Sequence, residues 1–198
     1  IDTGADALGL VAAMPSAPGP IGDEQIAEIA AWVPPPITTF MLTAETTADR
    51  ISRHVEATRP TAVQIVSHIE PAEAAKLADL QSGVRRVQVI HVEDMSALDL
   101  IPAYAPYMHA FLLDSGRPGA ATPEFGGTGR RHDWSISRAF VEASPLPVFL
   151  AGGLDPDNAR QAVHEGSPFG LDLCTGVRTD GRLDEVKLQA FMVAAMAA

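Results

Sequence analysis

Four short stretches in the second half of the chain decide the fold: FLLDSG (Phe111–Gly116), GGTGRRHDW (Gly126–Trp134), FLAGGLDPDN (Phe149–Asn158) and LDLCTGV (Leu171–Val177). Three of them begin as apolar strands and end in a carboxylate or in small residues. Parallel α/β barrels place their binding groups at the carboxyl ends of their strands, beside loops that hold phosphate. The pattern therefore predicts a phosphate pocket next to a proton donor.

Apolar runs alternate with amphipathic stretches along the rest of the chain. The expected strands are Ala7–Ala13, Thr38–Thr43, Ala62–Val66, Arg86–His91, Ala110–Asp114, Val148–Ala151 and Gly170–Cys174. The expected helices are Asp23–Trp32, Thr47–Ala57, Pro71–Ser82, Ser96–Tyr104, Ser135–Ala143, Pro156–Glu165 and Asp184–Ala197. Strands that are apolar along their whole length and alternate with helices predict a parallel sheet covered by helices. Asp23 and Asp155 are expected to cap helices, and Gly83 and Gly166 to end them.

The composition fits one soluble domain over residues 1–198. Of these residues 46% are hydrophobic and 20% are charged, which is enough for a substantial core. The formal net charge of −11 disfavours nucleic acid as a partner, because phosphate backbones need clustered Lys and Arg. A small phosphorylated molecule is compatible with this charge, since a few backbone N–H groups can hold one phosphate.

The single Cys174 permits no internal disulfide, so a cytoplasmic location is expected. No apolar run reaches membrane-spanning length, and the N-terminal residues do not have the form of a signal peptide. Membrane association is therefore not expected. Both a monomer and a homodimer remain open.

Asp114 is the leading candidate for catalysis. It ends the apolar strand that contains Phe111, at the carboxyl end where barrel enzymes keep their sites. A carboxyl group in this place can act as a general acid. The alternative is an aspartate that caps the turn after the strand. The glycine-rich motifs on either side favour catalysis.

Glycine-rich turns mark the candidate binding loops. The loop Gly126–Gly129 has backbone N–H groups that an anion can approach, so Gly127 and Thr128 are expected to contact the substrate. The loops after the last two strands of such barrels form the usual phosphate site. The expected phosphate ligands in those loops are Gly152, Gly153, Thr175, Gly176 and Val177. The alternative is that these glycines only permit tight turns.

Asp172 lies on the last expected strand, where period-two alternation puts it on the same side as Cys174. A lone cysteine in an apolar strand is more often an inert core residue than a nucleophile. The six histidines show no spacing typical of metal ligands, and no metal or other cofactor is expected. His68 and His91 follow expected strands and could line the pocket. The other histidines are expected at the surface or in ordinary packing.

In order and spacing these motifs resemble the phosphoribosylanthranilate isomerase family of tryptophan synthesis. The resemblance implies a TIM (β/α)8-type barrel whose first βα unit precedes Ile1, so that this domain is N-terminally incomplete. It implies an Amadori rearrangement of N-(5-phosphoribosyl)anthranilate, with Asp114 as the general acid that protonates the ribose ring oxygen. It further implies that Gln64 and Asp172 contact this small phosphorylated substrate and that no cofactor takes part.

Three family features are absent or altered. The family's general base is a cysteine in K-I-C-G, which this sequence does not contain. The family's S-P-R, whose arginine holds the anthranilate carboxylate, corresponds here to residues 16–21, which include no arginine. The family's V-Q-L-H-G corresponds to residues 63–67, which keep Gln64 but have no histidine. The nearest replacement cations are Arg117, Arg130 and Arg131.

These departures leave two alternatives open beside the isomerase. One is a divergent paralogue that acts on another phosphorylated sugar or metabolite. The other is a non-catalytic barrel that binds a phosphorylated ligand.

Overall fold

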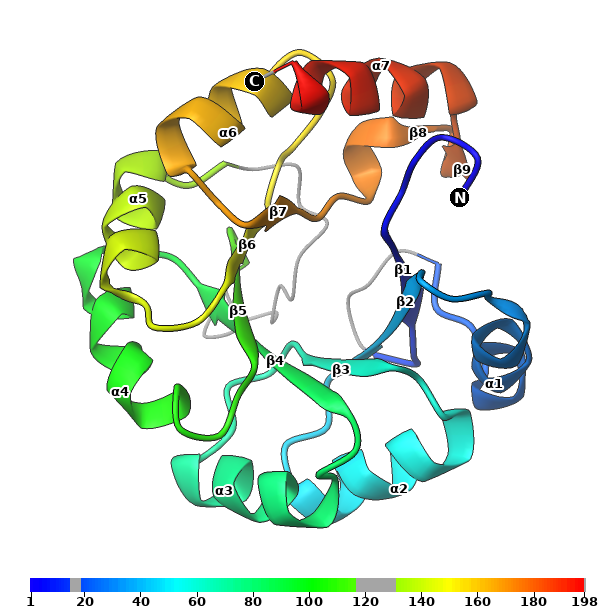
Figure 1. The fold of residues 1–198 in the computed structure, drawn as a ribbon, viewed down its shortest axis with the longest axis vertical. Helices are drawn as coiled ribbons and strands as arrows, with labels where there is room; N and C mark the ends of the chain where they lie inside the picture. Colours follow the sequence, from blue (N-terminus) through cyan, green and yellow to red (C-terminus); the bar gives the residue numbers. More distant parts are fainter. Residues whose placement is uncertain (15–18, 117–130, 198) are drawn as a thin grey trace.

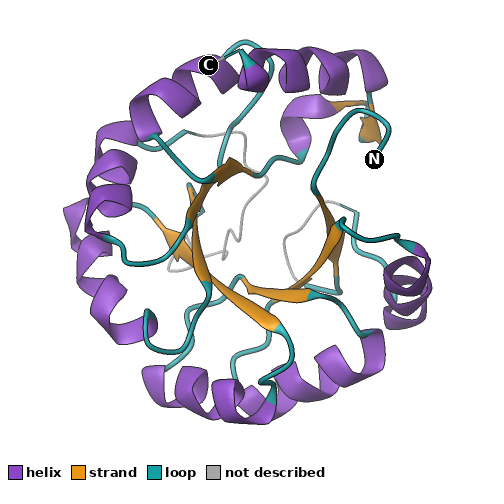
Figure 2. Cartoon of the chain, viewed as in Figure 1, coloured by secondary structure: helices purple, strands orange, loops and turns teal. Residues whose placement is uncertain are grey.

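The computed structural model describes residues 1–14, 19–116 and 131–197. Its centre is a seven-stranded parallel sheet in which the strands follow chain order, and helices surround this curled sheet (Figure 1, Figure 2). The strands are β1 (Ala7–Val11), β2 (Thr38–Thr43), β3 (Ala62–Ile65), β4 (Arg85–His91), β5 (Ala110–Asp114), β6 (Val148–Leu150) and β7 (Gly170–Leu171). The helices are α1 (Asp23–Trp32), α2 (Ala48–Thr58), α3 (Pro71–Leu80), α4 (Ile101–Tyr104), α5 (Trp134–Ala143), α6 (Ala159–Gly166) and α7 (Glu185–Met196), with 3-10 helices η1 (Met95–Leu100) and η2 (Thr175–Val177). The predicted α/β fold class is confirmed.

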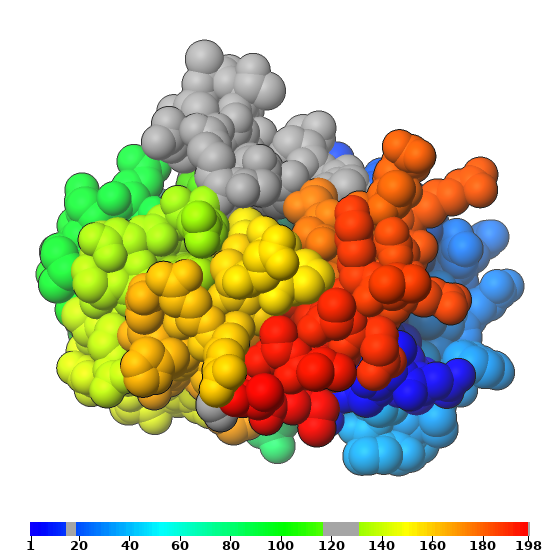
Figure 3. Space-filling view, turned by 90° about the horizontal axis from the view of Figure 1, so that it is seen from above, coloured from blue at the N-terminus to red at the C-terminus, as the bar shows by residue number. Residues whose placement is uncertain are grey.

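Within the described residues, β1 and β7 are the two edges of the sheet. Helix α7 lies beside the N-terminal residues (Figure 3), where a Cβ added to Gly4 would lie 3.7 Å from Met192 Cε. A hairpin of two-residue strands, β8 (Arg178–Thr179) and β9 (Arg182–Leu183), precedes α7. The sequence did not predict this hairpin, because strands so short carry no periodicity. In the part of the chain that the structure describes, no helix combines the length and the apolarity needed to cross a bilayer.

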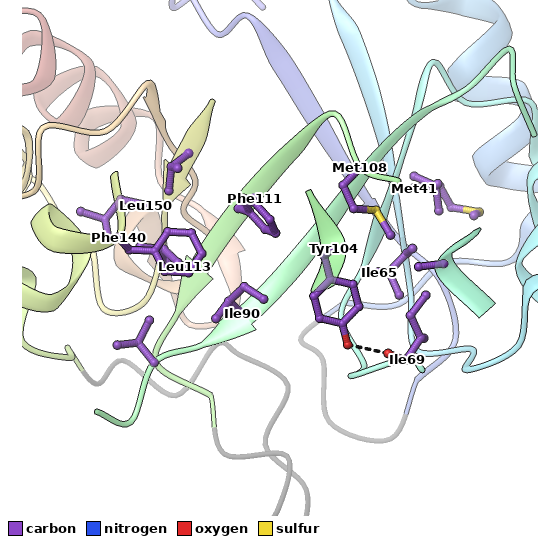
Figure 4. Packing of buried hydrophobic residues seen from close by; sticks show 14 of the residues in the cluster. Met41, Ile65, Ile69, Ile90, Tyr104, Met108, Phe111, Leu113, Phe140 and Leu150 are labelled. Atoms are coloured by element: carbon purple, nitrogen blue, oxygen red, sulfur yellow. Dashed lines mark hydrogen bonds between the residues drawn. The ribbon is translucent and has the colours of Figure 1, made fainter. Parts of the chain in front are cut away.

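The two faces of the sheet carry separate apolar clusters. The outer cluster joins strand residues such as Phe111 and Leu113 to helix residues such as Phe140 (Figure 4). The inner cluster contains strand residues such as Val89 and Leu112 and no residue of the described helices. Side chains of a strand alternate between its faces, so the cluster to which one residue belongs fixes the direction of its neighbours.

Most predicted element bounds agree with the structure to within one or two residues, and the exceptions have local causes. The strand predicted over Gly170–Cys174 ends at Leu171, because its partner strand β6 ends at Leu150, with which Leu171 is paired. The helix predicted from Ser96 begins as the 3-10 helix η1. Helix α4 follows it and has a proline in its first turn, where the missing N–H is tolerated.

The predicted helix caps are wrong in detail. Asp23 is the first residue of α1, and its N-cap is Gly22. Asp155 caps the turn before α6, since its Oδ1 accepts from the backbone N–H groups of Asp157 and Asn158 at 2.9 and 3.0 Å. That turn delays the start of α6 to Ala159.

The two predicted helix stops also differ from the structure. Helix α3 ends at the C-cap Gln81, before Gly83. Gly166 is the last residue of α6, and the C-cap is Ser167 at φ 49°. A left-handed residue ends this helix, as expected, but the residue is not the glycine.

The outer cluster predicts which aromatic residues stabilise the fold. Phe140 is fully buried, and its ring meets that of Phe111 edge to face with the centroids 5.3 Å apart. Phe140→Ala is expected to lower the free energy of unfolding by about 3–5 kcal/mol, because it leaves a cavity under α5. Urea unfolding followed by circular dichroism measures the change.

Phe169→Ala is the matched control, because Phe169 is 72% exposed. It is expected to change the free energy of unfolding by less than about 1 kcal/mol. Equal losses in the two variants would contradict this account of the core.

Candidate functional site

Polar side chains gather on the inner face of the sheet at the carboxyl ends of its strands. Asp114 ends β5 two residues after Leu112 of the inner cluster, so its side chain lies on the inner face. His91 ends β4 two residues after Val89 and is in register with Asp114. Asp172 follows Leu171, which packs in the outer cluster, and therefore points inward.

Asp114 is the most buried acid of this group, with 9% of its surface exposed. Burial raises the pKa of its carboxyl to about 6, although the backbone N–H of Ser115, which donates to Oδ1 at 2.7 Å, opposes the rise. A general acid works best with a pKa near the working pH, because it must hold a proton and also give it up. The geometry and the pKa both suit that role.

Asp172 lies close enough to Asp114 for their charges to interact. Burial and, after it, the charge of Asp114 raise the pKa of Asp172 to about 6, while hydrogen bonds with the Gln64 side chain and the Leu173 backbone lower it. Gln64 is itself buried on β3. Three residues predicted from separate strands, Gln64, Asp114 and Asp172, are thus brought together.

The two predicted phosphate loops contact each other beside this group. Gly152 and Gly153 have φ values of 86° and 65°, which favour glycine. A Cβ on Gly152 would lie 2.2 Å from Ser115 Oγ and 2.9 Å from Asp114 Oδ1. A Cβ on Gly176, in η2, would lie 1.9 Å from the carbonyl oxygen of Leu154. The loop after β6 therefore abuts the acid on one side and the loop after β7 on the other, and these contacts exclude larger residues.

The remaining members of these loops are held in place locally. Asn158 Nδ2 donates to the carbonyl oxygen of Gly153 at 2.9 Å. Thr175 and Val177 form η2 with Gly176, and Val177 is buried. Cys174 precedes η2 and lies beyond β7, so strand alternation does not extend to it as expected. The cysteine is partly exposed rather than a core residue.

Two predicted substrate contacts, Gly127 and Thr128, lie outside the described residues, as do Arg117 and Arg130. Arg131 is described, and its guanidinium lies 5.8 Å from the centroid of the Trp134 ring. Trp134 is buried in the outer cluster, so its ring packs in the core. Within residues 1–14, 19–116 and 131–197, no group of three or more His, Cys, Asp or Glu side chains is arranged to hold a metal ion.

The histidines differ most from expectation. His91 Nε2 donates to the carbonyl oxygen of Val66 at 2.8 Å, and burial lowers the pKa of the ring. His68 is exposed, and its ring meets that of Tyr104 edge to face. His132, expected at the surface or in ordinary packing, instead bridges Ser115 and Ser137. Only the folded chain brings these two serines to opposite sides of one ring, so the sequence carried no signal for it.

The raised pKa values predict an unusual dependence of stability on pH. The folded-state pKa of Asp172 is about 6 and the ordinary pKa of an aspartate is 3.8, so between these pH values the folded chain binds more protons than the unfolded one. The free energy of unfolding therefore falls as pH rises through this range. Asp172→Asn removes the effect and should stabilise the protein by about 3 kcal/mol above pH 7, with a gain of less than about 1 kcal/mol at pH 4. Urea unfolding at both pH values measures the difference.

Asp157→Asn, at an exposed position, is the matched control. Its stability should follow the wild-type curve at every pH. An Asp172→Asn gain that is the same at pH 4 and pH 8 would contradict the assignment of the effect to this carboxyl.

Comparison with known proteins shows to which family the chain is related. The family model for N-(5'phosphoribosyl)anthranilate (PRA) isomerase matches residues 1–194. An N-(5'-phosphoribosyl)anthranilate isomerase from Natronomonas pharaonis is 37% identical over 197 residues, which cover 98% of this chain and 89% of the relative. The isomerase from Methanocella arvoryzae is 33% identical over 187 residues, which cover 94% of this chain and 85% of the relative.

Solved structures agree on the fold. The phosphoribosyl anthranilate isomerase from Thermotoga maritima superposes with a TM-score of 0.82 at 23% identity, covering 100% of this chain and 91% of that one. An isomerase in complex with reduced 1-(o-carboxyphenylamino)-1-deoxyribulose 5-phosphate has a TM-score of 0.80 at 22% identity, covering 100% and 90%. Because the family model matches almost the whole length of this chain, the chain belongs to the N-(5'-phosphoribosyl)anthranilate isomerase family.

Proposed function

We propose that this chain catalyses the Amadori rearrangement of N-(5'-phosphoribosyl)anthranilate, with Asp114 as the general acid. Family membership supports the reaction. The observation that supports the role of Asp114 is its position. Its buried carboxyl lies at the carboxyl end of β5, on the inner face of the sheet, next to Asp172 and Gln64, and its pKa is about 6. We place the reaction in the cytoplasm, which suits a chain with one free cysteine.

The reaction needs a proton at the sugar ring oxygen. Asp114 donates this proton as the bond between C1 and the ring oxygen breaks, and the lone pair of the anthranilate nitrogen forms the C=N bond of a Schiff base. A general base then takes the proton from C2 to leave an enolamine, and the enol O–H proton moves to C1 as the enolamine tautomerises to the 2-ketose. C2 is oxidised and C1 is reduced within one molecule, so the balance requires no external oxidant or reductant.

The two loops beside Asp114 are proposed to hold the substrate's phosphate through the backbone of Gly152, Gly153 and Thr175–Val177. Their mutual contact places both loops on one side of the acid, which supports this assignment. Phosphate bound there would position the sugar ring over the carboxyl, so that binding energy remote from the reacting carbon orients it. Gln64 and Asp172 are proposed to contact the sugar, and Gly127 and Thr128 to complete the site within one domain of residues 1–198.

One sequence feature favours a second candidate function. No arginine occurs at residues 16–21, where the resembling family holds the anthranilate carboxylate. A paralogue acting on another phosphorylated sugar would bind two ligands with similar affinity. One is ribose 5-phosphate, and the other is the product analogue that carries anthranilate, reduced 1-(o-carboxyphenylamino)-1-deoxyribulose 5-phosphate. Calorimetry with the two ligands separates the candidates, because the isomerase is expected to bind the analogue at least about tenfold more tightly.

Asp114→Asn tests the proposed acid. Asparagine keeps the shape of the side chain but cannot donate a carboxyl proton, so kcat should fall by about 10²–10⁴-fold while KM changes little. Steady-state kinetics with N-(5'-phosphoribosyl)anthranilate measure both constants. In the wild type, kcat/KM should decline as pH rises above about 6, because the acid of the free enzyme loses its proton.

Asp133→Asn is the matched control, because Asp133 is exposed and its carboxylate caps α5 by accepting from Ser135 N–H at 2.9 Å. It should lower the free energy of unfolding slightly and leave kcat within about twofold. A folded wild-type protein with no isomerase activity would refute the proposed reaction. An active Asp114→Asn variant would refute only the role of this residue.

A further inference from the structure

His132 connects the rigid frame of the fold to the start of the loop that follows β5. Its Nδ1 lies 2.8 Å from Ser115 Oγ, and its Nε2 lies 2.6 Å from Ser137 Oγ. Both ring nitrogens are therefore occupied by serine hydroxyls. The three residues form one hydrogen-bonded chain from α5 to the residue after Asp114.

The end of this hydrogen-bonded chain that lies in α5 is anchored. Ser137 lies in α5 and is 1% exposed, and Asp133 caps the same helix. Burial lowers the pKa of His132 to about 4, so the ring is neutral at pH 7 and carries one N–H. A hydroxyl can both donate and accept, so either tautomer keeps both bonds.

The other end of this hydrogen-bonded chain, at Ser115, contacts the Asp114 carboxyl. The backbone N–H of Ser115 donates to Asp114 Oδ1 at 2.7 Å. Ser115 Oγ occupies the space that a Cβ on Gly152 would fill, so the loop after β6 closes the opposite side of this serine. His132 on one side and Gly152 on the other leave Ser115 little freedom, and its amide is aimed at the carboxyl.

We propose that His132 is a positioning residue: through Ser115 it holds the amide that orients the Asp114 carboxyl. The inference rests on the proposed role of Asp114. Two further ionisable groups face Asp114, namely Asp172, which directly follows β7, and His91, which is in register with it on β4; Asp133 adjoins His132. These groups are the same in every variant below, so a difference between variants reports on position 132.

His132→Phe keeps a ring of similar size and removes both hydrogen bonds. The Ser115 amide would then be less well aimed, so kcat is expected to fall by about 10- to 100-fold with KM changed less than about threefold. His132→Asn, whose amide can replace Nδ1 toward Ser115, should recover at least half of the loss on a logarithmic scale. His164→Phe, at an exposed histidine, is the matched control and should behave as the wild type.

A titration that does not depend on turnover separates positioning from folding. In a ¹³C-carboxyl NMR titration, the Asp114 pKa should rise from about 6 in the wild type to about 7 in His132→Phe, since an aimed N–H favours the carboxylate. The decline of kcat/KM with pH should move upward by the same amount. If the wild type has no isomerase activity, the proposed reaction fails, and the titration alone still decides the positioning role.

Two results would overturn the inference. One is a His132→Phe variant with unchanged kcat and an unchanged Asp114 titration. The other is a variant that loses both stability in urea and kcat, keeps the wild-type titration and gains nothing from asparagine. The second result would assign His132 a purely structural role.

Discussion

The alternation of side chains along seven parallel strands is the constraint on which the rest of this structure depends. One set of alternate residues packs outward against the helices, as Phe111 and Leu113 do, and the other set faces inward. Because every strand runs in the same direction, the last inward residue of each strand reaches the same end of the sheet. A slip of one residue in β5 would turn Asp114 outward and bury a carboxyl among the apolar residues of α5.

The glycines at the strand ends follow from how closely the loops approach this group. Gly152 leaves no room for a Cβ because Ser115 and the Asp114 carboxyl occupy that space, and Gly176 is excluded from carrying one by the Leu154 carbonyl. The steric need for glycine and a role in phosphate binding are therefore not competing explanations. The same close packing keeps both positions free of side chains of their own, so it does not conflict with the proposed approach of a phosphate to their backbone.

Much of the fold could be predicted because its signals are local. Apolar runs, glycine pairs and helical spacing are properties of neighbouring residues, and the strand ending at Asp114 could be placed to the residue from them. The convergence of Gln64 with Asp114 and Asp172 was implied only by the resemblance to the isomerase family, and strands that run in parallel and end together permit it. The role of His132 could not be predicted, because it depends on Ser115 and Ser137 reaching one ring from different segments. Cap positions failed for a related reason: Asp155 serves a turn before α6, and sequence alone does not distinguish that turn from the helix.

The free-energy cost of burying Asp114 beside Asp172 bears on which of its possible roles is correct. An aspartate that only capped the turn after β5 would be more stable in water, yet this carboxyl is nine-tenths buried beside a second one. A site that only bound a phosphorylated ligand would gain nothing from two acids, because carboxylates repel a phosphate dianion. A carboxyl with a pKa of about 6 keeps its proton to a higher pH than an exposed aspartate, and in the proposed reaction it delivers that proton to the sugar. The proposed proton transfer by Asp114 would account for burial that destabilises the folded chain at neutral pH.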